Sequence, residues 1–506
     1  MNTNVAFVLM LLGLGCLFGQ DASKPATKDA VEEAARPPIP KTLGRPELQK
    51  SEHDRSDVFD SDKAPAISET LKGQPKEGKI TGFDFYRDPL NADKPAPSFE
   101  AGMAKEAAAK AGIMDAQRRL LESRYTLTPN FHASAKMSRG KPVCVGPTVR
   151  LSSGATWEQV GAMTPEEIRK RRLFPYPSLP HPLHVNGGQV FPKMQVEVFP
   201  RLERFDVDFD LPEAFLPEFP PAIFLNNRPE LGDVSRGEIV SINNYYRLFK
   251  DILTPVQLDG LRMLLTPFPQ EEFNPTDDRK TREPSLGVTC FDCHVNGHTT
   301  GQFHLTPDVR PQNRRFRLDT TSLRGVLNQQ IHGSKRSLRS VEDFTEFEQR
   351  TAYFNGDAIH AMKKGLNIID RVQVSHMAQF QNMIDFPPAP KLDPMTGRLN
   401  PAKANEAEMR GEKLFFGKAQ CAACHPAPFY LDQQMHDLHL ERFTEGEPGD
   451  GPIKSFTLRG IKESPPYLHD GRCLTLEDVV EFFNLVQGLK LSQQEKADLV
   501  AFLRCL

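Results

Sequence analysis

Apolar positions in the C-terminal half of the chain recur every three or four residues, which is the period of an amphipathic helix. Thr254 and Gln257 form a capping box around a proline, ahead of leucines on one helical face: Leu258, Leu261, Leu264 and Leu265. The same pattern predicts a helix over 406–416 and another after the capping box of Ser492 and Glu495. No alternating strand pattern competes here, so the predicted fold class is mainly α.

The N-terminal half has a different pattern. An almost unbroken apolar run predicts a secretory signal peptide over 1–19, in which Cys16 is a candidate lipid-bearing cysteine. Residues 20–110 are polar and rich in proline, without apolar periodicity, and predict a flexible, partly disordered leader. Residues 111–234 predict an extension that packs on the rest of the chain. Its prolines over 209–224 forbid a long helix and predict an extended segment lying over a neighbouring domain.

Composition and charge narrow the class of protein. The 506 residues include 34 phenylalanines and are 39% hydrophobic, enough for sizeable cores. Net charge is −3, with 63 basic against 66 acidic residues, so no basic field indicates a nucleic-acid partner. Beyond the N-terminal run, no stretch is apolar enough to predict a transmembrane span. We therefore expect an exported, periplasmic globular protein; its oligomeric state is left open.

The most specific motif is Cys-x-x-Cys-His, which occurs at 290–294 and 421–425. Two thiols at this spacing can each form a thioether to one porphyrin, and the adjacent imidazole can bind the iron. The alternatives are a thioredoxin-type disulfide or half of a zinc site. A zinc ribbon separates its cysteine pairs by about 15 to 20 residues, whereas 131 separate these (421 − 290 = 131). We therefore predict two covalently bound c-type haems, attached at Cys290, Cys293, Cys421 and Cys424, with His294 and His425 as proximal iron ligands.

Two of the remaining cysteines flank the last helical region. Cys473 and Cys505 could form a disulfide in an oxidising compartment, and the alternative is two buried thiols. Spacing alone leaves this choice open.

The haem motifs head two copies of an internal repeat. Three blocks of the first copy recur in the second: 322–326 as 457–461, 332–333 as 469–471, and 340–344 as 475–479. The offset is 135 residues between Arg324 and Arg459 (459 − 324 = 135). The repeat predicts two cytochrome c-like haem lobes in tandem, over 235–395 and 396–506.

The region of roughly 235–506 resembles the bacterial di-haem cytochrome c peroxidases and the related quinone-maturing di-haem enzymes. The C-terminal signature of these enzymes is matched by residues 456–460, 465–471 and 476–484. The resemblance implies that hydrogen peroxide reacts at the first-lobe haem. The second haem would relay electrons from a small donor protein, a cytochrome or a cupredoxin. A base must move a proton between the peroxide oxygens. Relatives also hold a calcium ion between the lobes, for which no ligand loop is recognisable here.

The second lobe departs from the family pattern. The axial methionine or tyrosine of relatives falls at Phe483, which cannot bind iron. A sixth ligand would have to come from the other lobe or from Met435, His436, His439 or His469. The alternative role for His469, contact with haem propionates or with the lobe interface, is the one that we favour.

The first lobe departs as well. The Trp-Asp-Gly block of relatives is matched by Ile331-His332-Gly333, and the one tryptophan, Trp157, lies far upstream. Glu342, Glu346 and Glu348 are candidates for the acidic residue that assists peroxide cleavage, with a solvated helix face as the alternative. His298 and His304 are the distal candidates, and His304 is preferred as a switchable ligand; its alternative is a surface loop.

Two functions follow. The preferred one is an exported di-haem peroxidase that reduces hydrogen peroxide to water. The alternative is a non-catalytic di-haem electron carrier that docks a larger redox complex. Oxidative modification of a partner protein is disfavoured, because the axial tyrosine is absent.

Overall fold

The computed structural model describes residues 99–179, 189–203, 208–266, 289–305, 317–335, 338–348, 370–444 and 451–506. All of them belong to one compact unit, Lys79–Leu506. The predicted signal peptide, Cys16 and residues 20–98 of the predicted leader lie outside the described residues.

Helices and short strands alternate along the unit. The helices are α4 (Phe99–Arg124), α5 (Trp157–Ala162), α6 (Pro165–Arg171), α7 (Lys193–Val198), α8 (Tyr245–Phe249), α9 (Pro255–Leu264), α10 (Cys290–Cys293), α11 (Val341–Glu348), α13 (Arg371–Gln381), α14 (Glu406–Phe416), α15 (Leu476–Val486) and α16 (Gln493–Leu503). The strands are β1 (Asn130–Lys136), β2 (Pro142–Val145), β3 (Gln189–Val190), β4 (Phe224–Leu225), β5 (Phe303–Leu305), β6 (Arg317–Asp319), β7 (Ile384–Asp385), β8 (Met435–His436) and β9 (Ile453–Lys454). They pair antiparallel as β1-β2, β3-β5-β6, β4-β7 and β8-β9.

The mainly helical fold is confirmed, with small sheets added to it. Capping boxes at Thr254, Asn405 and Ser492 start α9, α14 and α16, because each side chain accepts from the backbone N–H three residues on. The helix α4 begins at Phe99, inside the range predicted as leader, where alanine, lysine and glutamate favour a helix. In the described part of the chain, none of the helices combines the length and apolarity needed to cross a bilayer.

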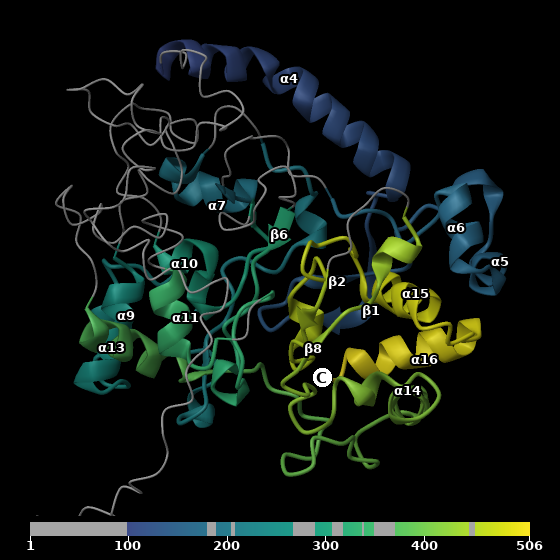
Figure 1. Cartoon of the computed structure of the whole chain (residues 1–506). Helices are drawn as coiled ribbons and strands as arrows, with labels where there is room; N and C mark the ends of the chain where they lie inside the picture. Colours follow the sequence, from purple (N-terminus) through teal and green to yellow (C-terminus); the bar gives the residue numbers. More distant parts are fainter. Residues whose placement is uncertain are drawn as a thin grey trace, which may run out of the picture. The chain divides into compact units, whose positions relative to one another are not determined.

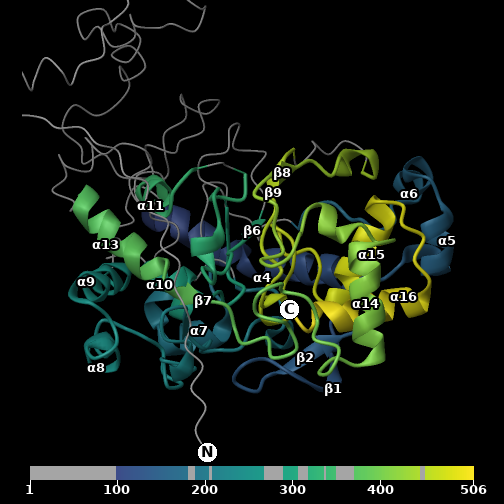
Figure 2. The same cartoon turned by 90° about the horizontal axis from the view of Figure 1, so that it is seen from below.

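The described residues form two main hydrophobic cores. One is built on α8, α9 and α13 and is contacted by Cys290 and Cys293. The other is built on α14, α15 and α16 and is contacted by Cys421. Figures 1 and 2 show α9, α10, α11 and α13 on one side and α14, α15 and α16 on the other. Each core therefore holds one Cys-x-x-Cys-His motif.

Each core contains a close helix pair. The helix α9 packs on α13 where Gly260 meets the carbonyl of His376, and α14 packs on α16 where Gly411 meets the carbonyl of Asp498. A Cβ at either glycine would overlap the facing carbonyl oxygen. In both halves, the helix before the haem motif (α9 or α14) therefore crosses the last helix of its core (α13 or α16) at a glycine.

The internal repeat has a structural counterpart. Gly325 (φ 70°) and Gly460 (φ 75°) both have left-handed backbone and are each followed at once by a 3₁₀ turn. A β-bridge then joins His332 to Leu338 in the first copy and Tyr467 to Cys473 in the second. The helices α11 and α15 follow. Corresponding elements keep the offset seen between Arg324 and Arg459, which supports two related lobes.

The extension contributes to both cores. Its segment 209–224 is extended apart from one 3₁₀ turn, as predicted from its prolines. Leu211 and Phe215 pack in the core of α14–α16, whereas Ile223 packs in the core of α9 and α13. The extension thus crosses from one core to the other.

Candidate functional site

The first haem motif lies on α10, a single helical turn. Thr289 caps this turn, and Asp292 returns the bond to the cap, so the motif has a fixed start. His294 directly follows the turn, and its Nδ1 lies 2.9 Å from the carbonyl oxygen of Thr321. Donation from Nδ1 to a carbonyl fixes the tautomer in which Nε2 carries the lone pair for iron.

Residues of the extension hold this motif in place. The Gln195 amide is fully buried and donates to the Asp292 carbonyl at 2.5 Å. The Arg201 guanidinium lies 2.8 Å from the Asp292 carboxylate. Burial raises the pKa of Asp292, and Arg201 opposes this. Neither Gln195 nor Arg201 was predicted from the sequence, because they lie about 90 residues upstream in no recognisable motif.

The second haem motif forms a 3₁₀ turn over Cys421–Ala423. His425 repeats the arrangement of His294, with Nδ1 2.9 Å from the carbonyl oxygen of Tyr430. Tyr430 is fully buried, and its hydroxyl donates to the Gly397 carbonyl at 2.6 Å. Both proximal histidines are therefore held by a backbone carbonyl.

A cavity of about 380 Å³ opens beside the second motif. Cys421, Cys424 and His425 line it, and most of its wall is apolar, including Phe415, Val479, Phe482, Leu499 and Leu503. Pockets of about 300–1,000 Å³ with apolar walls and few polar groups are typical of sites for organic cofactors. Two thiols and an imidazole on the wall of an apolar cavity fit a c-type haem.

The thiols do not fit a thioredoxin-type site. Burial raises the pKa of Cys421 to about 12 and that of Cys293 higher still. Thioredoxin-type exchange needs a thiolate, which burial in apolar surroundings disfavours. Covalent attachment to porphyrin leaves an uncharged thioether and involves no such cost in the folded protein.

The structure divides the sixth-ligand candidates of the second haem. Phe483 lines the cavity at the position where relatives supply an axial ligand, with its ring 5.1 Å from that of Phe482. His436 and His469 also line the cavity, whereas Met435 and His439 are outside its wall. His436 and His469 are thus the candidates placed at the cofactor cavity.

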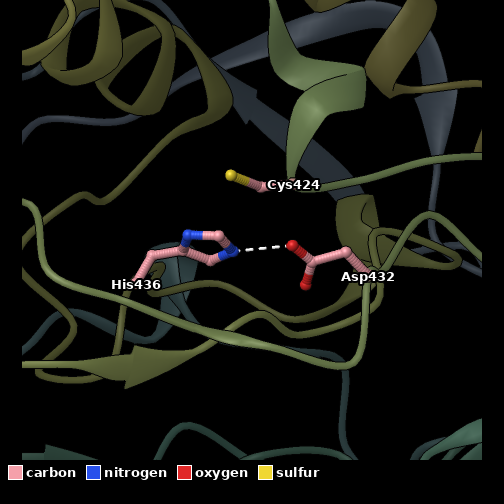
Figure 3. Close-up of side chains that lie close together, drawn as sticks. All are labelled: Cys424, Asp432 and His436. Carbon is pink, nitrogen blue, oxygen red and sulfur yellow. Dashed lines mark hydrogen bonds and ion pairs between the residues drawn. The ribbon is translucent and has the colours of Figure 1, made fainter.

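His436 belongs to a small polar cluster. Its Nε2 lies 2.6 Å from Asp432, and the ligand atoms of Cys424, Asp432 and His436 lie within 4.8 Å of one another (Figure 3). Such a group could also hold a metal ion. With Cys424 committed to a thioether, its thiolate would not be available for one, so we interpret Asp432 as the residue that orients His436.

The distal candidates of the first haem are placed differently. His298 is buried, with Nδ1 2.8 Å from the Ser322 hydroxyl and Nε2 2.9 Å from the Glu463 carbonyl, so it links the two halves. The backbone of His304 lies in β5, and its side chain is outside the described ones. The His469 carbonyl accepts from the Asp319 amide at 2.9 Å, which places His469 at the lobe interface.

The three candidate glutamates lie on α11. Glu346 pairs with Arg371 and is a solvated face residue. Burial raises the pKa of the Cys293 thiol, and the charge of Glu348 adds a smaller contribution. Glu342 is half-buried.

Three further positions bear on the predictions. Trp157 lies in the extension and packs edge-on against Phe174 at 5.7 Å. His332, in the block where relatives carry tryptophan, is buried. Cys473 and Cys505 are both free, so the disulfide that spacing left open does not form in this structure.

Together, the paired motifs, the two carbonyl-held histidines and the apolar cavity are the features expected of a c-type cytochrome. Comparison with curated proteins then confirms the family resemblance. The chain is 30% identical to the cytochrome-c peroxidase IdrP1 of Denitromonas iodatirespirans over 155 residues, covering 21% of this chain and 41% of that protein. It is 32% identical to the methylamine utilization protein MauG of Methylorubrum extorquens over 120 residues, covering 19% and 33%. The cytochrome c551 peroxidase of Nitrosomonas europaea is 29% identical over 153 residues, covering 27% and 44%. Over the matched region, the chain is related to the di-haem cytochrome c peroxidases and MauG.

These matches are partial. The chain spans about two fifths of the length of the curated relatives it matches. No protein-family model matches the chain. Among solved structures, a MauG-like protein associated with microbial copper homeostasis is 20% identical, covering 51% of this chain and 90% of that chain, with a TM-score of 0.33. That score is too low to carry an argument.

Proposed function

We propose that this protein is an exported di-haem c-type cytochrome that reduces hydrogen peroxide to water with electrons from a small donor protein. The observation that carries the proposal is the duplicated site, in which each Cys-x-x-Cys-His motif belongs to its own core and presents a histidine held by a carbonyl. The named relatives support the peroxidase class.

The reaction consumes two electrons and two protons for each peroxide and yields two waters. A c-type haem supplies the redox-active iron, whose potential depends on its axial ligands and surroundings. His294 and His425 would bind the haem irons and orient the haems. Their Nδ1 bonds to Thr321 and Tyr430 keep each ring in one tautomer and strengthen Nε2 as a donor.

A proton must also be moved between the peroxide oxygens. Glu348 is our candidate for this role, because its carboxylate acts on Cys293, which attaches the first haem. Glu346 is engaged in an ion pair with Arg371 on the surface of α11, so we do not favour it for this role. His304, in β5, stays a proposed distal ligand.

The second site suits electron relay. Phe483 fills the wall where relatives place an axial ligand, and the Asp432-oriented His436 is the sixth ligand we favour. A second imidazole would give this haem a lower potential than a thioether ligand would. The donor protein, export to the periplasm and two haems per chain are all parts of this proposal.

A non-catalytic electron carrier is the second candidate. Ile331 replaces the tryptophan of relatives, and His298, which lies close to the first motif, is engaged with Ser322 and Glu463. In this alternative both irons are six-coordinate and peroxide does not react.

One experiment separates the two functions. The full chain is produced in cells that assemble c-type cytochromes, its mass is checked for two haems, and peroxide-dependent oxidation of a reduced small cytochrome is followed. The enzyme should show a high-spin haem in the mixed-valence state together with turnover. Two low-spin haems together with no turnover would favour the non-catalytic electron carrier. A colourless protein would contradict both.

A further inference from the structure

Lys454 is a buried cation on the wall of the second haem cavity. It ends β9, is 3% exposed and lines the same cavity as Cys421 and His425. Its backbone N–H donates to the Ser334 carbonyl at 2.9 Å, so its position is fixed from the first half of the chain. A side chain in this position cannot reach bulk water freely.

The ammonium lacks a counter-charge among the described residues. Its Nζ donates to the amide oxygen of Gln329 and lies 4.4 Å from the centre of the Phe456 ring, but no described carboxylate is within ion-pair distance. Burial lowers the pKa of Lys454 to about 7. A buried ammonium is costly unless an anion accompanies it, so the cavity favours an anionic group beside Nζ.

A second buried polar group lines the same cavity. Thr320 is 4% exposed, and its hydroxyl has no hydrogen-bond partner among the described residues. A buried hydroxyl without a partner costs free energy that a ligand can recover. Thr320 follows β6 in the first half of the chain, whereas Lys454 belongs to the second. The cavity therefore presents a cation and a hydroxyl donor from opposite lobes.

We propose that Lys454 and Thr320 bind the propionate carboxylates of the second haem. The inference rests on the proposed function, because it requires a haem at Cys421 and Cys424. Propionates are the anionic groups that the cofactor itself would bring into this mostly apolar cavity. Because Gln329 holds Lys454 and Thr320 comes from the first lobe, the second haem is bound across the lobe boundary and its potential depends on first-lobe residues.

Midpoint potentials of both haems test this in the holo-protein. Spectroelectrochemical titration compares the wild type with Lys454→Met, Lys454→Arg and Thr320→Val, after assigning each haem with the proximal-histidine variants. Removing a positive charge beside the porphyrin stabilises the ferric state, so Lys454→Met should lower the second-haem potential and leave the first unchanged. Lys454→Arg should keep most of the wild-type potential, and Thr320→Val should lower it by a smaller amount.

Lys413→Met is the matched control, because Lys413 is exposed on α14. Its second-haem potential should equal that of the wild type. If Lys454→Met and Thr320→Val both titrate like this control, the inference is wrong even if peroxidase activity is present. If Lys454→Met does not retain haem, Lys454→Arg and Thr320→Val decide. A wild type that binds two haems but does not turn over peroxide would contradict the enzyme and leave this inference testable.

Discussion

The Nδ1 atom of His294 lies 2.9 Å from the carbonyl oxygen of Thr321, and Thr321 lines the cavity beside the second haem motif. One hydrogen bond thus connects the proximal ligand of the first site to the wall of the second. Related enzymes use a tryptophan between the haems, and Ile331 stands at the matching position here. The segment 319–321 is one of the connections between the two sites within the described residues.

Replacing either proximal histidine by glycine should alter one haem and leave the other intact. The thioethers to Cys290 and Cys293, or to Cys421 and Cys424, would still hold the porphyrin, so the mass should not fall by a haem. Optical and electron paramagnetic resonance spectra of His294→Gly and His425→Gly check this. His132→Gly, in the exposed strand β1, is the control. An unchanged spectrum in either proximal variant would disprove that ligand.

The buried ion pair between Arg324 and Glu463 should stabilise the lobe interface. Its atoms are 2.8 Å apart, both side chains are 3% exposed, and the Ser138 hydroxyl also donates to Glu463. Arg324→Met leaves a buried carboxylate without its partner and should cost about 3–5 kcal/mol of unfolding free energy. Denaturant titration measures this.

The control for that pair is exposed. Arg247→Met breaks an ion pair with Glu238 whose side chains are 59% and 40% exposed, and it should cost about 1 kcal/mol or less. Equal losses from the two variants would show that the Arg324 pair contributes no more than a surface pair.

Stability should fall as pH drops from about 6.5 to 4 because of His332. Burial, assisted by Lys454, lowers the pKa of His332 to about 4. The unfolded ring takes up a proton below pH ~6.5, whereas the folded ring does not until pH ~4, so protonation favours the unfolded state in this window. The contribution is fully present above pH ~6.5 and amounts to about 2 kcal/mol between pH 7 and 5.

His332→Asn should remove that part of the pH dependence. The free energy of unfolding is measured at pH 7 and 5 in the variant and the wild type. His439→Asn is the comparison, since the His439 side chain is 65% exposed and lies outside the wall of the cavity. If His332→Asn and the wild type lose equal stability on acidification, the assignment to His332 is wrong.

Gln195→Leu should weaken the first haem site selectively. The variant removes the donor to the buried Asp292 carbonyl, whereas the Thr300 hydroxyl keeps the amide oxygen of Gln302 as an acceptor at 3.1 Å. Leaving the carbonyl unsatisfied costs about 1–3 kcal/mol. The first haem should lose its native absorbance at a lower denaturant concentration than in the wild type, with the second haem unchanged. Gln159→Leu, at the exposed cap of α5, should have little effect.

Local signals predicted the helices well. The starts of α9, α14 and α16 follow from Thr254, Asn405 and Ser492, because a cap is a bond between near neighbours in sequence. The haem attachment motifs are local for the same reason. The first residues of α4 were missed, since a polar, alanine-rich stretch without an apolar face is compatible with both a helix and a leader.

Long-range contacts could not be predicted in the same way. His298 follows the first motif closely and so suggests an iron ligand, but its partner Glu463 lies far along the chain. The roles of Gln195 and Lys454 likewise depend on contacts with Asp292 and Gln329, which no spacing rule indicates. That Lys454 is buried without a counter-charge can be seen only once the fold is known.

The extension determines how small a working fragment can be. A polypeptide starting at residue 235 would keep both attachment motifs and the whole region of family resemblance. It would also lose Tyr125, Phe174, Phe215 and Leu216, all buried in the core that surrounds α15. Without these residues, the aromatic side chains of that core would be exposed to solvent. Truncation to the two lobes should therefore yield an insoluble product and not a minimal cytochrome.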